Sequence, residues 1–65
     1  MMTGAELSHN VKKLGEFYSR ENFAGMNCSG IDLSGGIFTE VNFDGCDFSG
    51  SDLQAATFSE CSFVN

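Results

Sequence analysis

The single histidine, His9, is the side chain of this protein best suited to general acid or base chemistry near neutral pH. Catalysis by histidine also needs a nucleophile or an acid held beside it, and the sequence offers no such partner. We therefore interpret His9 as a solvated surface residue. No catalytic residue, enzyme activity or cofactor is predicted.

Three cysteines, Cys28, Cys46 and Cys61, are the other candidates for chemistry. Their number is odd, so they cannot all pair within one chain. None has the C-x-x-C spacing typical of a metal site. We interpret them as small buried apolar residues, and no metal is expected.

Charge is distributed unevenly along the chain. Residues 1–20 carry a net charge of +1, whereas residues 21–65 contain seven acids and no Lys or Arg. Contacts to phosphates come mostly from Lys and Arg, so direct nucleic-acid binding is not expected. A basic protein surface is the natural electrostatic partner.

No apolar run approaches the roughly 20 residues that a membrane span needs, and no membrane contact is predicted. The first twenty residues also lack the apolar core of a secretory signal. The sequence therefore predicts a soluble, cytoplasmic protein.

A five-residue repeat positions most of the remaining side chains. Asn or Asp precedes the centre of the unit six times, Ser or Thr follows it five times, and Gly closes five of the nine units. All nine central positions are apolar, and they are Phe23, Cys28, Leu33, Phe38, Phe43, Phe48, Leu53, Phe58 and Phe63.

This period fits neither ordinary secondary-structure element. Successive centres would lie about 140° apart on a helix and would alternate between the two faces of a strand. They can share one core only if the chain bends once in every unit, and Gly, Asn, Asp and Ser favour such bends. Repeats that bury apolar residues only against their neighbours are typical of a solenoid.

The nine units resemble the pentapeptide-repeat proteins, whose units read roughly A-(D/N)-L-x-x with Phe or Leu at the centre. The resemblance covers residues 21–65 and implies an all-β solenoid, a right-handed quadrilateral β-helix with four units per coil and about two coils. Residues twenty apart then stack: Phe23 on Phe43 on Phe63, Cys28 on Phe48, Leu33 on Leu53, and Phe38 on Phe58.

Residues 1–20 are expected to cap the first coil. Thr3 and Glu6 fit a capping box, and apolar residues recur at helical spacing at Leu7, Val11, Leu14 and Tyr18. We predict an amphipathic helix over residues 4–19, weakened at Gly15 by about 1 kcal/mol.

No comparable cap is predicted beyond the last unit, so Phe63 is expected at an open end. Three explanations remain. The chain is part of a longer solenoid, the open coil meets a second copy end to end as a homodimer, or the last coil frays.

Most acids need no functional explanation. Asp32, Asp47 and Asp52 occupy the Asn/Asp position of the repeat, where hydrogen bonds to nearby backbone suffice. Glu40, Asp44 and Glu60 lie outside that position.

One predicted face departs from the repeat. Glu40 and Glu60 are twenty residues apart, and neither of their units closes with Gly. We hypothesise that a protein partner docks there, and the alternative is ordinary drift in a tolerant repeat. The proposed face comprises Ile37, Thr39, Glu40, Thr57, Ser59 and Glu60.

These features favour a non-enzymatic protein-interaction or structural module. The resemblance implies an alternative, because some pentapeptide-repeat proteins look like B-form DNA in width and charge and bind DNA gyrase, protecting or inhibiting it. Residues 21–65 share the negative charge. However, nine units make two and a quarter coils, which span only about 11 Å at the ~4.8 Å spacing of paired strands, and the C-terminal element through which those gyrase binders dimerise is not found here.

Overall fold

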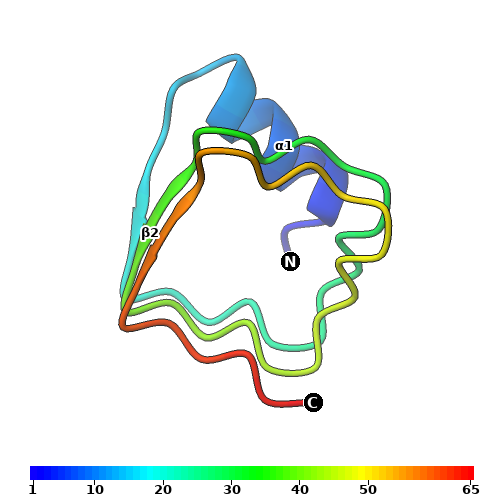
Figure 1. The fold of residues 1–65 in the computed structure, drawn as a ribbon, viewed down its shortest axis with the longest axis vertical. Coiled ribbons are helices and arrows are strands. Elements are labelled where there is room, and N and C mark those ends of the chain that lie inside the picture. Colours follow the sequence, from blue (N-terminus) through cyan, green and yellow to red (C-terminus); the bar gives the residue numbers. More distant parts are fainter.

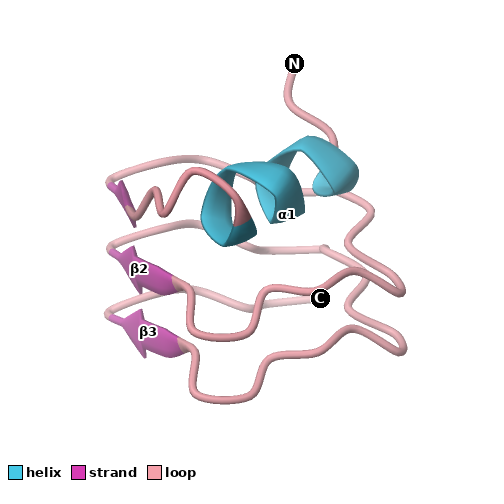
Figure 2. Cartoon of the chain, turned by 90° about the horizontal axis from the view of Figure 1, so that it is seen from above, coloured by secondary structure: helices cyan, strands magenta, loops and turns pink.

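The structure, a computed structural model, describes all 65 residues. It contains one helix, α1 (Gly4–Lys12), and three short strands, β1 (Tyr18–Ser19), β2 (Ile37–Thr39) and β3 (Thr57–Ser59). The strands form one parallel sheet in the order β1-β2-β3. Between strands the chain makes wide, angular coils, and these coils stack with α1 at one end (Figures 1 and 2).

Residues twenty apart are neighbours throughout the stack. Phe38 pairs with Phe58 within the sheet, and isolated parallel bridges join Asn22 to Asn42, Asn27 to Asp47 and Asp32 to Asp52. Inside the coils, the ring of Phe43 stacks on that of Phe63 at 5.4 Å between centroids. The predicted twenty-residue stacking is therefore confirmed.

The Asn/Asp position of the repeat stabilises each bend, as predicted. The side-chain oxygen of Asp32, for example, accepts hydrogen bonds from the N–H of Ser34 at 2.9 Å and from its hydroxyl at 2.6 Å. This pair of hydrogen bonds explains why Ser often follows the centre of the unit. Equivalent side-chain acceptors occur at Asn22, Asn27, Asn42, Asp47 and Asp52.

Helix α1 covers the first coil. The predicted capping box is present, since Thr3 N–H donates to Glu6 and Glu6 N–H donates to the Thr3 hydroxyl. Leu7 and Val11 are buried with the centres of the first coil. Ser8 also donates to the Asp32 carbonyl at 2.6 Å, so α1 is attached by both apolar and polar contacts.

The predicted extent of this helix, residues 4–19, is wrong. The helix ends at Lys12, and Gly15 adopts a left-handed conformation with φ of 65°. Leu14, expected on the buried face, is 60% exposed. Tyr18 belongs to β1 and pairs with Phe38 of β2. Parallel pairing with β2, together with the glycine, overrides the helical spacing in the sequence.

Candidate protein-binding face

The outer side of the parallel sheet is the most unusual surface of the molecule. Tyr18, Phe38 and Phe58 point inward, where the rings of Phe38 and Phe58 stack at 5.2 Å. Residues on either side of them therefore point outward. We call this outer surface the strand face, and it consists of Phe17, Ser19, Ile37, Thr39, Thr57 and Ser59.

Large apolar side chains are exposed on the strand face. Phe17 is 73% exposed and Ile37 is 50% exposed. Ile37 lies opposite Thr57 in the sheet register, and Phe17 immediately precedes the pairing of Tyr18 with Phe38. Neither side chain contributes to the buried core, so folding does not explain them.

One corner of the coils, beside the strand face, is built from strained residues. Arg20, Glu40 and Glu60 directly follow the strand positions and have φ angles of 58°, 55° and 54°. We call these three residues the corner column. Five other units place Gly in this conformation, which costs a residue with a side chain about 1–2 kcal/mol. Ala55 is the only other non-glycine residue with positive φ.

Charges in the corner column follow a fixed order. The Arg20 Nε lies 3.6 Å from the Glu40 Oε2, and both side chains are largely solvated. Glu60 takes part in no ion pair. The column therefore presents one positive charge followed by two negative charges, of which the outermost is free to bind a cationic group.

The structure brings together all six residues predicted to form a docking face. Ile37 is aligned with Thr57 and Thr39 with Ser59, and Glu40 and Glu60 follow at the corner. Whether a partner binds there stays a prediction.

Sequence reasoning missed the third layer of this surface, formed by Phe17, Ser19 and Arg20. A signal was available, because residues 16–20 read Glu-Phe-Tyr-Ser-Arg. That segment has an aromatic centre followed by Ser, and it lies twenty residues before the unit centred on Phe38.

Asp44, the third acid outside the repeat position, has a structural task. Its Oδ1 accepts hydrogen bonds from the Ser62 hydroxyl and, at 2.8 Å, from Val64 N–H. Gly45 N–H also donates to the Val64 carbonyl at 2.7 Å. Asp44 thus fixes the last unit to the coil before it, on a different side from the corner column.

The thiols lie on the inner side of the coils. The pKa of Cys28 is raised to about 11, mainly by burial and to a smaller extent by the nearby Cys46 and Asp47. Burial also raises the pKa of Cys46, whose Sγ donates to the Phe23 carbonyl at 2.9 Å. Both thiols therefore stay protonated at neutral pH, a poor state for a nucleophile.

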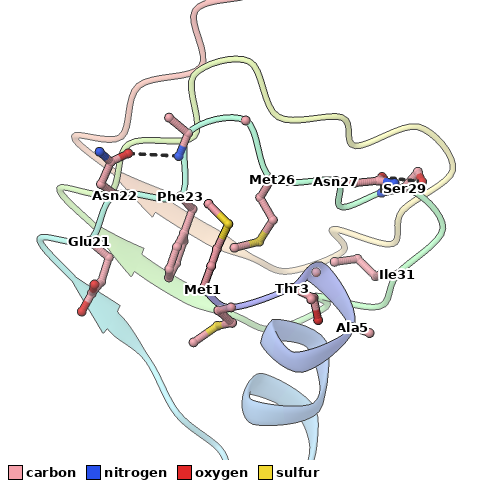
Figure 3. Close-up of a pocket in the computed structure, with 14 residues that line it drawn as sticks. Met1, Thr3, Ala5, Glu21, Asn22, Phe23, Met26, Asn27, Ser29 and Ile31 are labelled. Atoms are coloured by element: carbon pink, nitrogen blue, oxygen red, sulfur yellow. Dashed lines mark hydrogen bonds between the residues drawn. The ribbon is translucent and has the colours of Figure 1, made fainter.

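A hollow of about 760 Å³ opens beside α1, over the rim of the first coil. Figure 3 shows Met1, Phe23 and Met26 along one side of it. The polar side chains at its edge are engaged locally: Asn22 accepts from Ala24 N–H and Asn27 accepts from Ser29. The hollow is apolar and brings no acid, base and nucleophile together.

Comparison with protein families found one match. A family model described as pentapeptide repeats matches residues 22–65 in eight copies. Searches of curated proteins and of solved structures returned no match. No helix of the chain has the length and apolar character required to cross a membrane.

Proposed function

This chain belongs to the pentapeptide-repeat family, and we propose that it is a non-catalytic module that binds a protein partner through the strand face and the corner column. The repeat supplies a rigid support for that surface. On this proposal the coils form the right-handed quadrilateral β-helix implied by the family, with four units per coil. The module acts in the cytoplasm, alone or as part of a longer solenoid.

The observation that carries the proposal is that the corner column stacks three non-glycine residues whose backbones are strained. Glycine would satisfy the backbone at Arg20, Glu40 and Glu60 with less strain, as it does in five other units. Three of the four non-glycine residues with this backbone strain lie in the corner column, and such a concentration motivates a functional hypothesis. Here it coincides with exposed Phe17 and Ile37, which gives the surface the mixed apolar and charged character of a protein interface.

The charge order defines the partner. Glu60 is available for Lys or Arg, while Arg20 already neutralises part of the charge of Glu40. A partner that binds along the column therefore presents basic groups toward Glu40 and Glu60 and an apolar patch toward Phe17 and Ile37. Exposed charge pairs contribute mainly to specificity and association rate, so the apolar contacts provide most of the affinity.

The test begins with capture of binding proteins from the source cells and identification of the strongest one. Its affinity is then measured for Glu40→Lys/Glu60→Lys and for a control of equal net charge, Glu16→Lys/Glu21→Lys. We expect the first variant to weaken binding at least about tenfold, or 1.4 kcal/mol, and the control to change it much less. Equal effects of both variants would contradict the proposed site.

The acid excess of residues 21–65 supports a second candidate, imitation of DNA in binding to DNA gyrase. The molecule is shortest along the axis of the coils (Figure 1), at 21 Å, which corresponds to about six base pairs at 3.4 Å per step. A supercoiling assay with purified gyrase tests this candidate. Inhibition or protection that is lost in Glu40→Lys/Glu60→Lys would favour it, and an unchanged supercoiling rate would eliminate it.

A further inference from the structure

The strand face and the corner column together form one surface of three rows. Every layer of the sheet contributes an outward residue at the start of its strand, a hydroxyl residue two positions later and a corner residue, and Figure 2 shows these layers above one another at one side of the coils. The rows along the stack are Phe17, Ile37 and Thr57; Ser19, Thr39 and Ser59; and Arg20, Glu40 and Glu60.

The corner column has an unused positive charge at Arg20 and an unused negative charge at Glu60. The Arg20 side chain is 79% exposed, and its Nε lies 3.6 Å from Glu40, so much of the guanidinium still faces solvent. Glu60 is exposed and forms no ion pair. A column with this charge order is complementary to the same column read in the opposite direction.

We propose that a second copy of this chain occupies the surface, packed side by side with its layers in reverse order. The inference rests on the proposed function, because it assigns a partner to the same surface. A two-fold axis that lies between the two faces and runs parallel to β2 produces the arrangement, and such an interface is isologous. It sets β1 of each copy against β3 of the other and sets the two β2 strands against each other.

The charges select this axis. Under the rotation, Arg20 of each copy faces Glu60 of the second copy, so two equivalent charge pairs form. Glu40 meets Glu40 across the axis, but each of these carboxylates already has Arg20 of its own chain beside it. A two-fold axis along the stack would instead set Glu40 against Ile37, which removes a carboxylate from water without a partner.

The apolar row is complementary under the same rotation. Ile37 packs against Ile37 of the second copy, and Phe17 covers Thr57. Phe17 and Ile37 are among the most exposed large apolar residues of the single chain, and the contact removes both from water. Facing sheets lie about 10 Å apart, a gap that side chains fill, and the layer spacing of ~4.8 Å is the same in both copies. All three layers therefore stay in register.

Size and charge make this dimer weak. Three layers of short strands bury on the order of 300–400 Å² in each copy, below the range of stable interfaces. Each copy also carries a net charge of −6, and repulsion between copies is screened only in part at physiological salt. We therefore expect dissociation constants of about 0.1–1 mM, which a covalent trap and a concentrated sample can both detect.

The first experiment traps the dimer through its axis. Ile37→Cys places a thiol opposite the same thiol of the second copy, and Gln54→Cys places one at an exposed position on another side of the coils. Both variants, and the unmodified chain as background, are incubated at about 0.1 mM with oxidised and reduced glutathione. We expect the disulfide-linked species of twice 7.0 kDa to be at least about tenfold more abundant for Ile37→Cys, because the dimer raises the effective thiol concentration.

The second experiment exchanges charges and follows mass by sedimentation equilibrium in reducing buffer, up to about 1 mM protein. Arg20→Glu sets like charges against each other and should weaken association at least about fivefold. Arg20→Glu/Glu60→Arg restores opposite charges across the interface and should restore association. Arg20→Glu/Ala24→Lys/Gln54→Lys has the net charge of the unmodified chain but places the compensation on other sides, so association should stay weak.

Several outcomes separate this inference from the proposed function. A single-chain mass at every concentration, with equal cross-linking of both cysteine variants, would overturn the dimer and leave the surface to a different protein, which the capture experiment identifies. Association that is lost in Phe63→Lys but unchanged in Arg20→Glu would also overturn it, because the contact would then lie at the end of the stack. Assemblies larger than two would contradict a closed two-fold contact.

Discussion

The two ends of the stack are built from the same repeat but are buried to very different extents. Phe23, Phe43 and Phe63 occupy equivalent positions in successive coils and are 8%, 1% and 46% exposed, respectively. The first of these residues packs against Tyr18 and lines the hollow beside α1, coils lie on both sides of the second, and only one coil contacts the third. Burial in this molecule is therefore determined by the neighbouring layer and not by the residue or its place in the unit.

The covered end also differs in polarity. Ser8 and Lys12 of α1 bond to carbonyls of the first coil, which gives its open edge some of the partners that a preceding coil would supply. No equivalent side chains reach the other edge. We therefore expect substitutions at covered and uncovered positions to have unequal effects, and the experiments below test how the different parts of the stack are held.

Phenylalanine truncation should give the largest contrast. Phe43→Ala removes a ring held between two others and should lower the free energy of unfolding by about 3–5 kcal/mol, enough to unfold much of so small a domain. Phe63→Ala removes a half-exposed ring, and we expect about 1 kcal/mol in dilute protein. Urea denaturation followed by circular dichroism measures both. Equal losses would show that the coils do not bury residues in the order described.

Gly4→Ala should lift α1 from the first coil. A Cβ at this position would lie 2.2 Å from the Asn27 carbonyl oxygen, so the helix or the coil must move. We expect a loss of about 1–3 kcal/mol in the free energy of unfolding. The neighbouring Ala5→Ser adds one atom at an exposed position and serves as control. If both variants are equally stable, α1 does not pack as closely as the structure shows.

Acid should loosen the covered end. The pKa of Glu6 is lowered by its hydrogen bonds with Thr3, first with the backbone and then with the side chain. The pKa of Asp32 is lowered first by the Ser34 hydroxyl and then by the Ser34 N–H. Folding lowers both pKa values, so this stabilisation is present above their unfolded values of about 4 and is lost as pH falls through the lower folded values.

Helical circular dichroism and the amide signal of Leu7 should therefore decline on acidification. The pKa of Asp47 in the next coil is lowered by Ser49 in the same way, so the middle coil should respond as well. Glu6→Gln/Asp32→Asn keeps oxygen acceptors at both sites but removes their titration, and should flatten this pH dependence. An unchanged pH profile in that variant would mean that other carboxyl groups control the acid response.

Ala55→Gly should give the smallest effect, and it is a gain. Ala55 has a φ of 59°, and glycine relieves that strain while losing more entropy on folding, for a net stabilisation of about 0.5–1 kcal/mol. Glu60→Gly should stabilise the fold similarly but weaken binding of the proposed partner, whereas Ala55→Gly should not affect it. Loss of stability in Ala55→Gly would contradict the argument from backbone strain.

The sequence predicted the stack of coils because its signal is regular. Nine apolar centres at one spacing, with Asn or Asp before them, define both the inward side chains and the bends. The extent of α1 could not be predicted in the same way. Leu14 and Tyr18 continue the helical spacing of Leu7 and Val11, and only the long-range pairing of Tyr18 with Phe38 shows that this segment is a strand.

The strand face and the corner column were predicted only in part, because only some of their residues lie within the regular repeat. Ile37, Glu40, Thr57 and Glu60 stand out because they break a clear pattern. Phe17 and Arg20 precede the regular units, so they break no pattern and were overlooked. The left-handed conformation of the corner column, on which the proposed function depends, is a property of the folded chain that residue types alone do not reveal.

Hydrogen exchange of individual amides in dilute protein tests the stack most directly. The N–H groups of Phe23, Leu33 and Phe43 donate to residues nineteen positions further on, whereas those of Leu53 and Phe63 have no acceptor. We expect slow exchange for the first three amides and fast exchange for the last two, although all five belong to the same position of the repeat. Uniform protection of the five, or faster exchange at Leu33 than at Leu53, would contradict it.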